Sequence, residues 1–124
     1  MVVGLGVDLV ERDRVRAALE RWGERLVAKL MDAPEAASLP ADLAGRADAL
    51  ALAIAGKESV SKAIGTGWSR GVRWRDVVIR TTPPGATLLG AALAHARRLG
   101  SAGDGALALE VRGNLVLGEF QLFS

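Results

Sequence analysis

Hydrophobic and polar residues alternate along the first segment of the chain in the manner of a β-strand. Gly4, Gly6 and Asp8 share one face of this segment, and the other face carries the aliphatic side chains of Val3, Leu5, Val7 and Leu9. Because glycine has no side chain, we expect the glycine face to be open, so that another group can approach the backbone there. Asp8, near the end of the strand, is either a functional carboxylate on this open surface or a cap of the following helix.

Helical spacing replaces the alternation from residue 13 onwards. Apolar side chains recur at helical intervals over 13–22, and a shorter helix is expected over 26–31. Asp32, two positions before a proline, predicts the N-cap of a third, brief helix. The longest helical run spans 41–64, is rich in alanine, and ends at the breaker sequence of residues 65–67.

Strand patterns dominate the rest of the chain. We expect strands over 74–82, 106–111 and 115–123, and a helix over 90–99. The dipeptide Gly113-Asn114 separates the last two strands and indicates a β-hairpin. This order of elements predicts an α+β fold with a largely antiparallel sheet packed against the long helix. Because no linker or repeat interrupts the pattern, we expect residues 1–124 to form a single domain.

The composition restricts the chemistry. The 124 residues include one histidine and no cysteine, which excludes a disulfide scaffold, a cysteine-ligated zinc and a thiol nucleophile. Carboxylates, lysines, arginines and hydroxyl groups remain for catalysis, and this set favours Mg²⁺ over zinc. No apolar run reaches the roughly 18 residues of a membrane span, and the N-terminus lacks the basic start of a signal peptide. We therefore expect a cytoplasmic protein that does not bind a membrane.

Positive charge is in slight excess, with 16 lysines and arginines against 14 acidic residues. The arginines are scattered and most have acidic neighbours, so we do not expect a nucleic-acid-binding protein. Arginines that bind phosphates or an acidic protein partner explain the excess equally well.

One segment of the long helix carries most of the candidate chemistry. Glu58 and Lys62 are four residues apart and share one helix face, either as an ordinary surface ion pair or as a functional pair. Gly56 favours the second alternative, because a glycine inside a helix costs about 1 kcal/mol relative to alanine and indicates that a ligand or another backbone comes close. Ser59 and Ser61 add small polar groups around the pair.

The turn that ends this helix, Gly65-Thr66-Gly67, offers free amides and a hydroxyl group that suit phosphate oxygens. The C-terminus of a helix disfavours anions, however, so a phosphate there would need Lys57 or Lys62 beside it.

Two segments resemble the motifs of the holo-acyl-carrier-protein synthases, which are the short 4′-phosphopantetheinyl transferases. Gly4-Leu-Gly-Val-Asp-Leu-Val-Glu11, followed by Arg14, resembles their opening motif, and residues 57–67 are similar to their second motif. The separation between the two segments also fits the family, and the likeness extends over most of residues 2–100.

This resemblance implies a 4′-phosphopantetheinyl transferase-like fold and a defined reaction. The 4′-phosphopantetheine arm of coenzyme A passes to a serine of an apo acyl carrier protein, and adenosine 3′,5′-bisphosphate is released. By motif position, Asp8 and Glu58 hold Mg²⁺, and Glu58 or a metal-held water accepts the serine proton. Lys62 steadies charge on the phosphates and the leaving group. The coenzyme A site would be lined by Lys57, Lys62, Gly65, Thr66 and Gly67.

The resemblance also implies macromolecular partners. Arg14 matches the family position that meets the acidic carrier protein, and Arg21 and Arg25 are further candidates for docking. Family members form trimers with active sites between subunits, so we expect a homotrimer. The carrier would serve fatty-acid or polyketide biosynthesis.

Departures from the family pattern leave a second interpretation open. Ala53 stands where the family usually has an arginine, and residues 106–111 lack the polar His/Ser motif of many members. A catalytically impaired homologue that keeps carrier docking and trimerisation would explain both losses. The single histidine, His95, is expected on the surface of a helix.

Overall fold

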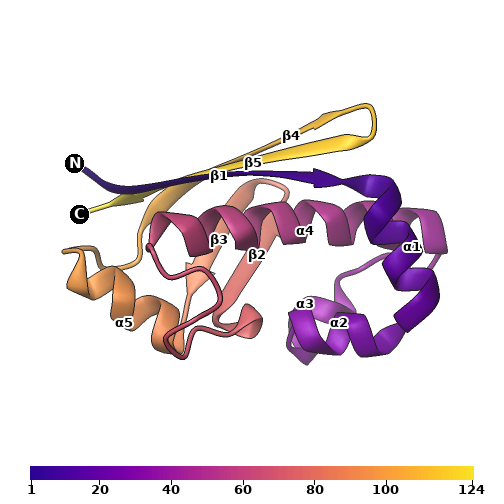
Figure 1. Ribbon diagram of the computed structural model, residues 1–124, viewed down its shortest axis with the longest axis horizontal. Coiled ribbons are helices and arrows are strands. Elements are labelled where there is room, and N and C mark those ends of the chain that lie inside the picture. The colour runs from indigo at the N-terminus through magenta and orange to yellow at the C-terminus, as the bar shows by residue number, and fades with distance from the viewer.

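The computed structural model describes all of residues 1–124 (Figure 1). Its elements in chain order are β1 (Val2–Glu11), α1 (Arg12–Trp22), α2 (Glu24–Leu30), α3 (Ala33–Ala37), α4 (Leu43–Ala63), the 3₁₀ turn η1 (Trp74–Asp76), β2 (Val77–Thr81), β3 (Pro84–Leu88), α5 (Gly90–Arg98), β4 (Gly105–Arg112) and β5 (Leu115–Phe123). The strand predicted over 74–82 therefore starts later, because its first residues form η1.

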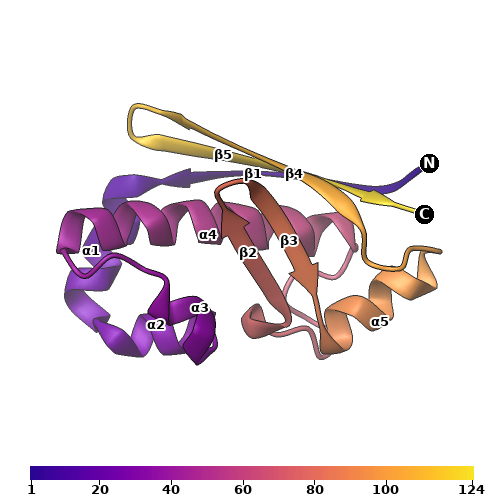
Figure 2. The same cartoon turned by 180° about the vertical axis from the view of Figure 1, so that it is seen from behind.

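Three strands form the larger sheet. They lie antiparallel in the order β1–β5–β4, while β2 and β3 form a separate two-stranded antiparallel sheet (Figure 2). Because the first strand pairs with the last, the two ends of the chain meet, and the Ser124 amide donates to the Met1 carbonyl oxygen at 2.9 Å. The predicted α+β class with an antiparallel sheet is confirmed.

Helix α4 lies directly on the backbone of β1 and β5. Gly4 and Gly6 of β1 face the helix, and a Cβ added at Gly6 would overlap the carbonyl oxygen of Ser59. A Cβ added at Gly118 of β5 would lie 2.6 Å from the Ala55 carbonyl oxygen. The glycine face is therefore not open, but the expected close approach to its backbone is confirmed, because the missing side chains make room for α4.

The aliphatic face of β1 is the open one. Leu5, Val7 and Leu9 keep 58%, 46% and 61% of their surface exposed. In Figure 1 no element covers this outer side of the sheet, which leaves a row of apolar side chains in contact with solvent.

The core lies between α4 and the elements that surround it. Fully buried side chains come from Leu50 and Val60 of α4, Phe120 and Leu122 of β5, and Val77 of β2. Helices α1 to α3 gather at the N-terminal end of α4, whereas α5 lies towards its C-terminal end (Figures 1 and 2). None of the helices combines the length and apolar character that a membrane crossing requires.

Candidate active site

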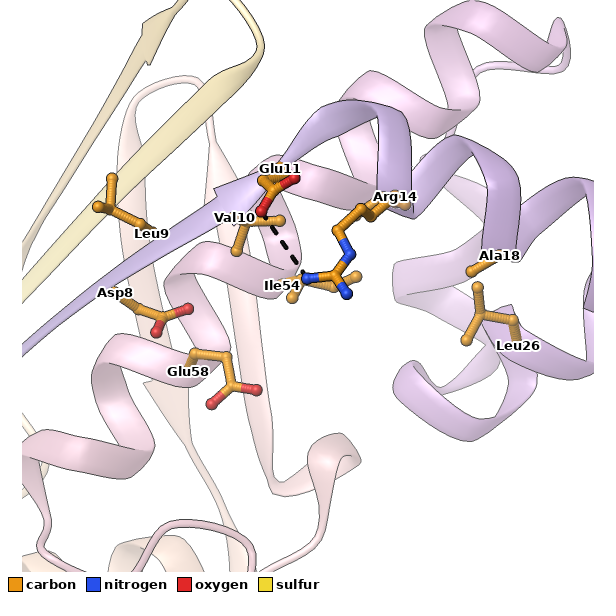
Figure 3. A pocket seen from close by; sticks show the side chains of 10 residues that line it. Asp8, Leu9, Val10, Glu11, Arg14, Ala18, Leu26, Ile54 and Glu58 are labelled. Carbon is orange, nitrogen blue, oxygen red and sulfur yellow. Dashed lines mark ion pairs between the residues drawn. The ribbon is translucent and has the colours of Figure 1, made fainter.

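Asp8 and Glu58 line one groove beside α1 (Figure 3). Asp8 projects from β1 and Glu58 from α4, so the packing of α4 on the glycine face of β1 brings the two carboxylates together. Arg14 of α1 lines the same groove, which has a volume of about 430 Å³ and is called the carboxylate groove below. Its apolar wall consists of Leu9, Val10, Val15, Ala18, Leu26 and Ile54.

Lys62 pairs with Asp8. Its ammonium group donates to Asp8 Oδ1 at 2.6 Å and to the Val7 carbonyl oxygen at 3.2 Å. The hydrogen bond to Asp8 raises the pKa of Lys62, so the ammonium group stays charged at neutral pH. The helical spacing of Glu58 and Lys62 suggested a pair within α4, but the salt bridge of Lys62 crosses to β1 instead.

Glu58 has an environment that disfavours its charged form. Burial is the main cause of a pKa above the ordinary 4.5, and the charge of Asp8 raises it further. The indole N–H of Trp68 and the charge of Lys62 act in the opposite direction. A carboxylate that is partly buried beside a second carboxylate is stabilised strongly by a bound cation.

The two carboxylates fit a hard divalent cation. Mg²⁺ sites in proteins usually combine one or two carboxylates with substrate phosphate oxygens and waters. The structure contains no group of three or more His, Cys, Asp or Glu side chains that could hold a metal by itself. A cation held by Asp8 and Glu58 would therefore take its other ligands from substrate and water.

Lys57 does not line the carboxylate groove. Its side chain is fully buried, and its ammonium group pairs with Glu35 Oε1 at 2.9 Å. It also donates to the carbonyl oxygens of Trp74, at 3.1 Å, and of Val77. All three of its donors are thus used inside the protein. Lys57 therefore cannot contact coenzyme A, as was predicted, because its side chain faces the core. Glu58 is the next residue of α4, and it faces the groove because adjacent helix positions point about 100° apart.

The Gly65-Thr66-Gly67 turn closes the end of α4. The amides of Thr66 and Gly67 donate to the Ser61 carbonyl oxygen at 3.3 and 3.1 Å, and that of Gly65 donates to the Lys62 carbonyl oxygen at 3.0 Å. Positive φ angles of 79° and 56° at the two glycines permit this geometry. The sequence suggested that these amides are free to bind phosphate oxygens, but in the structure they are already bonded to α4. None of the three residues lines the carboxylate groove.

The remaining small residues of α4 serve packing. Ser59 and Ser61 are buried, and their hydroxyl groups donate to the Gly56 and Glu58 carbonyl oxygens of the same helix, both at 2.8 Å. A Cβ at Gly56 would lie 3.0 Å from the Ile79 side chain, so β2 and not a ligand approaches the helix there. The close approach expected at Gly56 is confirmed, but it comes from the Ile79 side chain and not from a ligand, and the two serines bond within their own helix.

The three arginines predicted to dock a partner lie along α1 and α2. Arg14 is largely exposed, with its guanidinium 3.7 Å from Glu11 Oε1 (Figure 3). The Arg21 guanidinium lies 4.9 Å from the ring centroid of Trp22. Arg25 lines a second hollow beside that ring. A basic strip, made of Arg14, Arg21 and Arg25, thus extends from the carboxylate groove along the first two helices.

Two other positions lie away from the groove. His95 was predicted to lie on the surface of a helix, but it is only 9% exposed. Its ring nitrogens lie 3.3 Å from the Arg70 carbonyl oxygen and 3.3 Å from the Arg98 guanidinium. Ala53 is buried and lines a separate hollow together with Arg80. Neither position contributes to the wall around the two carboxylates.

Trp68 is a candidate that sequence reasoning missed. It follows the Gly65-Thr66-Gly67 turn directly and stacks on Trp74, with ring centroids 3.9 Å apart. Its indole N–H favours the charged form of Glu58 and thus opposes the rise of that pKa. The signal available in the sequence was an aromatic residue placed directly after a chemically distinctive turn.

Comparisons with known proteins relate most of the chain to one family. Residues 4–110 match the profile of the 4′-phosphopantetheinyl transferase superfamily. A holo-[acyl-carrier-protein] synthase from Solibacter usitatus is 40% identical over 103 residues, which cover 81% of this chain and 82% of that protein.

Two solved structures share the fold. Holo-[acyl-carrier-protein] synthase from Neisseria meningitidis matches with a TM-score of 0.83 and 23% identity over the full length of both chains. The enzyme from Helicobacter pylori, solved in complex with coenzyme A, matches with a TM-score of 0.78 and 16% identity over 96% of this chain and 99% of that one. The profile match and the 40% identity decide the family, and the chain belongs to the 4′-phosphopantetheinyl transferase superfamily, among the holo-acyl-carrier-protein synthases.

Proposed function

We propose that this chain is a magnesium-dependent holo-acyl-carrier-protein synthase. It transfers the 4′-phosphopantetheine arm of coenzyme A to a serine of an apo acyl carrier protein and releases adenosine 3′,5′-bisphosphate. The observation that carries the proposal is the meeting of Asp8, Glu58 and Lys62 from two distant segments, with Arg14 in the same groove as the carboxylates. Transfer of a phosphoryl-type group depends mainly on positioning and charge neutralisation, which two carboxylates and a lysine supply.

Asp8 and Glu58 are the residues that would hold the metal. When bound, Mg²⁺ neutralises the pyrophosphate of coenzyme A and helps to orient it for attack. The chain contributes two carboxylates from regular elements. Asp8 is fixed by its strand and by Lys62, and Glu58 is fixed by α4.

Glu58 is the group to which we assign the serine proton, taken directly or through a water. Its carboxylate lies in the same groove as Asp8, so it can accept a proton from a serine hydroxyl or a water that enters there. As the serine oxygen bonds to phosphorus, the bridging P–O bond to the nucleotide breaks, and the bisphosphate leaves with the electron pair of that bond. Lys62, half-exposed beside Asp8, can then stabilise the charge that develops on the leaving phosphate.

Coenzyme A is proposed to bind with its pyrophosphate beside Lys62 and its nucleotide near the end of α4. The complex solved for the Helicobacter pylori relative supports this choice of substrate. Gly65, Thr66 and Gly67 begin three residues after Lys62, so they remain proposed nucleotide contacts. They would act through the surface of the turn, because their amides already bond to α4.

The acyl carrier protein is proposed to dock on the basic strip of α1 and α2. Acidic helical carriers are attracted by the unshared positive charges of Arg21 and Arg25. Arg14 would guide the carrier towards the carboxylate groove, because it belongs both to the strip and to the groove wall. The serine would thereby reach Glu58.

A homotrimer is proposed in which the outer face of the larger sheet is covered by neighbouring copies. Leu5, Val7 and Leu9 of β1 are exposed there, and Leu115 of β5, which the strand register places on the same face, is 40% exposed. Apolar surface of this kind is stabilised by burial in an interface. We also propose that residues 1–124 form one transferase domain and that the protein acts in the cytoplasm.

The experiment that tests the function is direct. The protein is incubated with coenzyme A, Mg²⁺ and an apo acyl carrier protein, and the carrier is examined by mass spectrometry for the added arm. We expect the carrier to gain the arm, and the gain to disappear with Asp8→Ala or Glu58→Ala. A protein that modifies neither fatty-acid nor polyketide carriers, while a known transferase does so in parallel, would refute the proposal.

One observation favours a second candidate, a homologue that binds the carrier but transfers poorly. Position 53, where the sequence resemblance leads us to expect an arginine, holds a buried alanine, and Arg80 is the cation in that hollow. Carrier binding in solution without detectable transfer would support this candidate.

A further inference from the structure

His95 is the only histidine of the chain, and it is buried although no step of the proposed reaction uses it. It lies on the inner face of α5, together with Ala92 and Ala96, which are fully buried. A polar ring in such surroundings is costly unless its nitrogens form hydrogen bonds. The partners of the two ring nitrogens therefore indicate what this residue does.

Both ring nitrogens of His95 have a polar partner. Nε2 lies 3.3 Å from the Arg70 carbonyl oxygen, and Nδ1 lies 3.3 Å from the Arg98 guanidinium. A guanidinium can only donate hydrogen bonds, and a carbonyl oxygen can only accept them. Nδ1 therefore accepts from Arg98, and Nε2 carries the proton that it donates to Arg70. The two neighbours thus select one neutral tautomer of the imidazole.

Arg70 has an unusual backbone conformation. Its φ is 57°, and it is the only residue other than glycine with a positive φ. A residue with a Cβ is disfavoured in this left-handed region, so the conformation persists only where surrounding contacts hold it. The hydrogen bond that α5 donates to the Arg70 carbonyl oxygen is such a contact, and it comes from outside the loop that contains Arg70.

Two short turns connect Arg70 to the end of α4. The Ser69 hydroxyl group donates to the Thr66 carbonyl oxygen at 2.6 Å, and the Val72 amide donates to the Ser69 carbonyl oxygen at 3.1 Å. Arg70 and Gly71 form the centre of the second turn, and both have a positive φ, as in the mirror-image β-turns. Because Ser69 takes part in both turns, a change in the backbone of Arg70 would also displace Thr66.

We propose that His95 is a positioning residue for the coenzyme A site. Its neutral imidazole, kept in the Nε2–H tautomer by Arg98, holds the Arg70 carbonyl group. It thereby fixes the Gly65-Thr66-Gly67 turn in the shape that meets the nucleotide. His95 acts through the loop and does not touch the substrate. This inference rests on the proposed function, and it gives the single histidine a role that the family motifs do not assign.

Nuclear magnetic resonance tests the hydrogen bond without relying on activity. Because the chain has one histidine, the imidazole signals in a ¹H–¹⁵N correlation spectrum report on His95 alone. At about pH 8, where a free imidazole is neutral, we expect a protonated Nε2, an unprotonated Nδ1, and an Nε2–H proton that exchanges slowly with solvent. A protonated Nδ1, or an Nε2–H proton that exchanges as fast as in free histidine, would overturn the inference.

Substitutions test the consequence for the coenzyme A site. His95→Phe keeps a ring of similar size but removes the donor, and we expect KM for coenzyme A to rise about fivefold with kcat nearly unchanged. His95→Gln, whose amide group can donate to the same carbonyl oxygen, should recover most of the affinity. Ala92→Gly is the matched control, because it weakens α5 but leaves the imidazole in place. It should lower the melting temperature without raising KM.

The outcomes separate the two proposals. A His95→Phe variant with the KM of the wild type refutes the positioning role and leaves the proposed function intact. The same holds if Ala92→Gly raises KM equally, or if His95→Gln binds coenzyme A as poorly as His95→Phe. A wild-type protein that binds coenzyme A but transfers nothing refutes the function, and the coenzyme A affinities of the variants, measured by calorimetry, still decide the role of His95. A wild-type protein that does not bind coenzyme A refutes both.

Discussion

Lys62 Nζ and Asp8 Oδ1 lie 2.6 Å apart, although the two residues are separated by 54 positions in the chain. The contact joins α4 to β1 at the edge of the carboxylate groove. Its charge-assisted hydrogen bond holds Asp8 in place while about half of the Lys62 side chain stays exposed. The lysine can therefore neutralise Asp8 before substrate arrives and turn towards phosphate afterwards.

Lys62→Met should impair transfer strongly. The variant keeps the length of the side chain but removes the charge opposite the leaving phosphate, so we expect kcat/KM to fall about 100-fold. Lys62→Arg, which keeps the charge, should retain a larger share of the activity. Steady-state rates with an apo carrier measure both. A methionine variant within a factor of two of the wild type would contradict the role.

Asp8→Asn and Glu58→Gln should each reduce both the transfer activity and the binding of Mg²⁺. Each change keeps the side-chain shape but takes away one negative ligand, so we expect transfer to fall about 1,000-fold and Mg²⁺ binding in the presence of coenzyme A to weaken. Calorimetry measures the binding. Glu20→Gln, at an exposed acid paired with Arg16 on α1, is the matched control and should behave like the wild type.

Glu58 should make the metal-free protein less stable as the pH rises. Its pKa in the folded state is raised above the ordinary 4.5, mainly by burial, so the folded protein holds the proton more tightly than the unfolded chain. The contribution of Glu58 to stability is therefore greatest below the unfolded pKa and is lost as the pH passes through the folded value. We expect Glu58→Gln to melt higher than the wild type at neutral pH, in the presence of a chelator.

The same comparison at acid pH is the control. Below about pH 4 both states of the wild type carry a protonated Glu58, so the difference in melting temperature should shrink. A difference that is independent of pH would show that packing, and not ionisation, separates the two proteins.

Gly6→Ala should destabilise the fold. The new Cβ would overlap the Ser59 carbonyl oxygen, so α4 must move away from β1, at a cost of about 3 kcal/mol. Chemical denaturation measures this loss. Gly113→Ala is the comparison, because no atom lies within 4 Å of its Cβ and only its φ of 55° opposes the change, at about 1 kcal/mol. Equal effects at both positions would contradict the close contact of helix and strand.

Leu5→Lys should dissociate the proposed trimer. A lysine buried in an apolar interface without a partner is costly, whereas on the free sheet face it is harmless. Sedimentation velocity should show a trimer for the wild type and a monomer for the variant. Leu99→Lys, at a similarly exposed leucine at the end of α5, should remain trimeric. A monomeric wild type would refute the assembly.

Local patterns were sufficient for much of the fold. The alternating pattern over the first ten residues predicted β1, and the helical spacing over 41–64 predicted α4. Both patterns arise because side chains on one side of a strand or helix recur with the period of that element. The Gly113-Asn114 pair likewise marks the hairpin between β4 and β5. The short 3₁₀ turn before β2 was not predicted, since its three residues show no distinct period.

The candidate site was predicted less completely. The motifs selected Asp8, Glu58 and Lys62, and the structure places these three next to one another. Lys57 was assigned to the same site, but its ammonium group is consumed by Glu35 and two backbone carbonyls. Trp68 was overlooked, because its influence on Glu58 follows from the path of the chain after α4.

The sequence by itself determined the elements, the family and the type of side chain available for chemistry, because these depend on local periodicity and on residue identity. Only the tertiary structure decided which groups those side chains face. Gly6 borders a helix and not a ligand, Lys62 pairs with Asp8 across two elements, and Lys57 is buried one position away from an accessible Glu58. Each of these outcomes depends on how α4 is rotated and seated on the sheet, and this is set by packing between residues far apart in the chain.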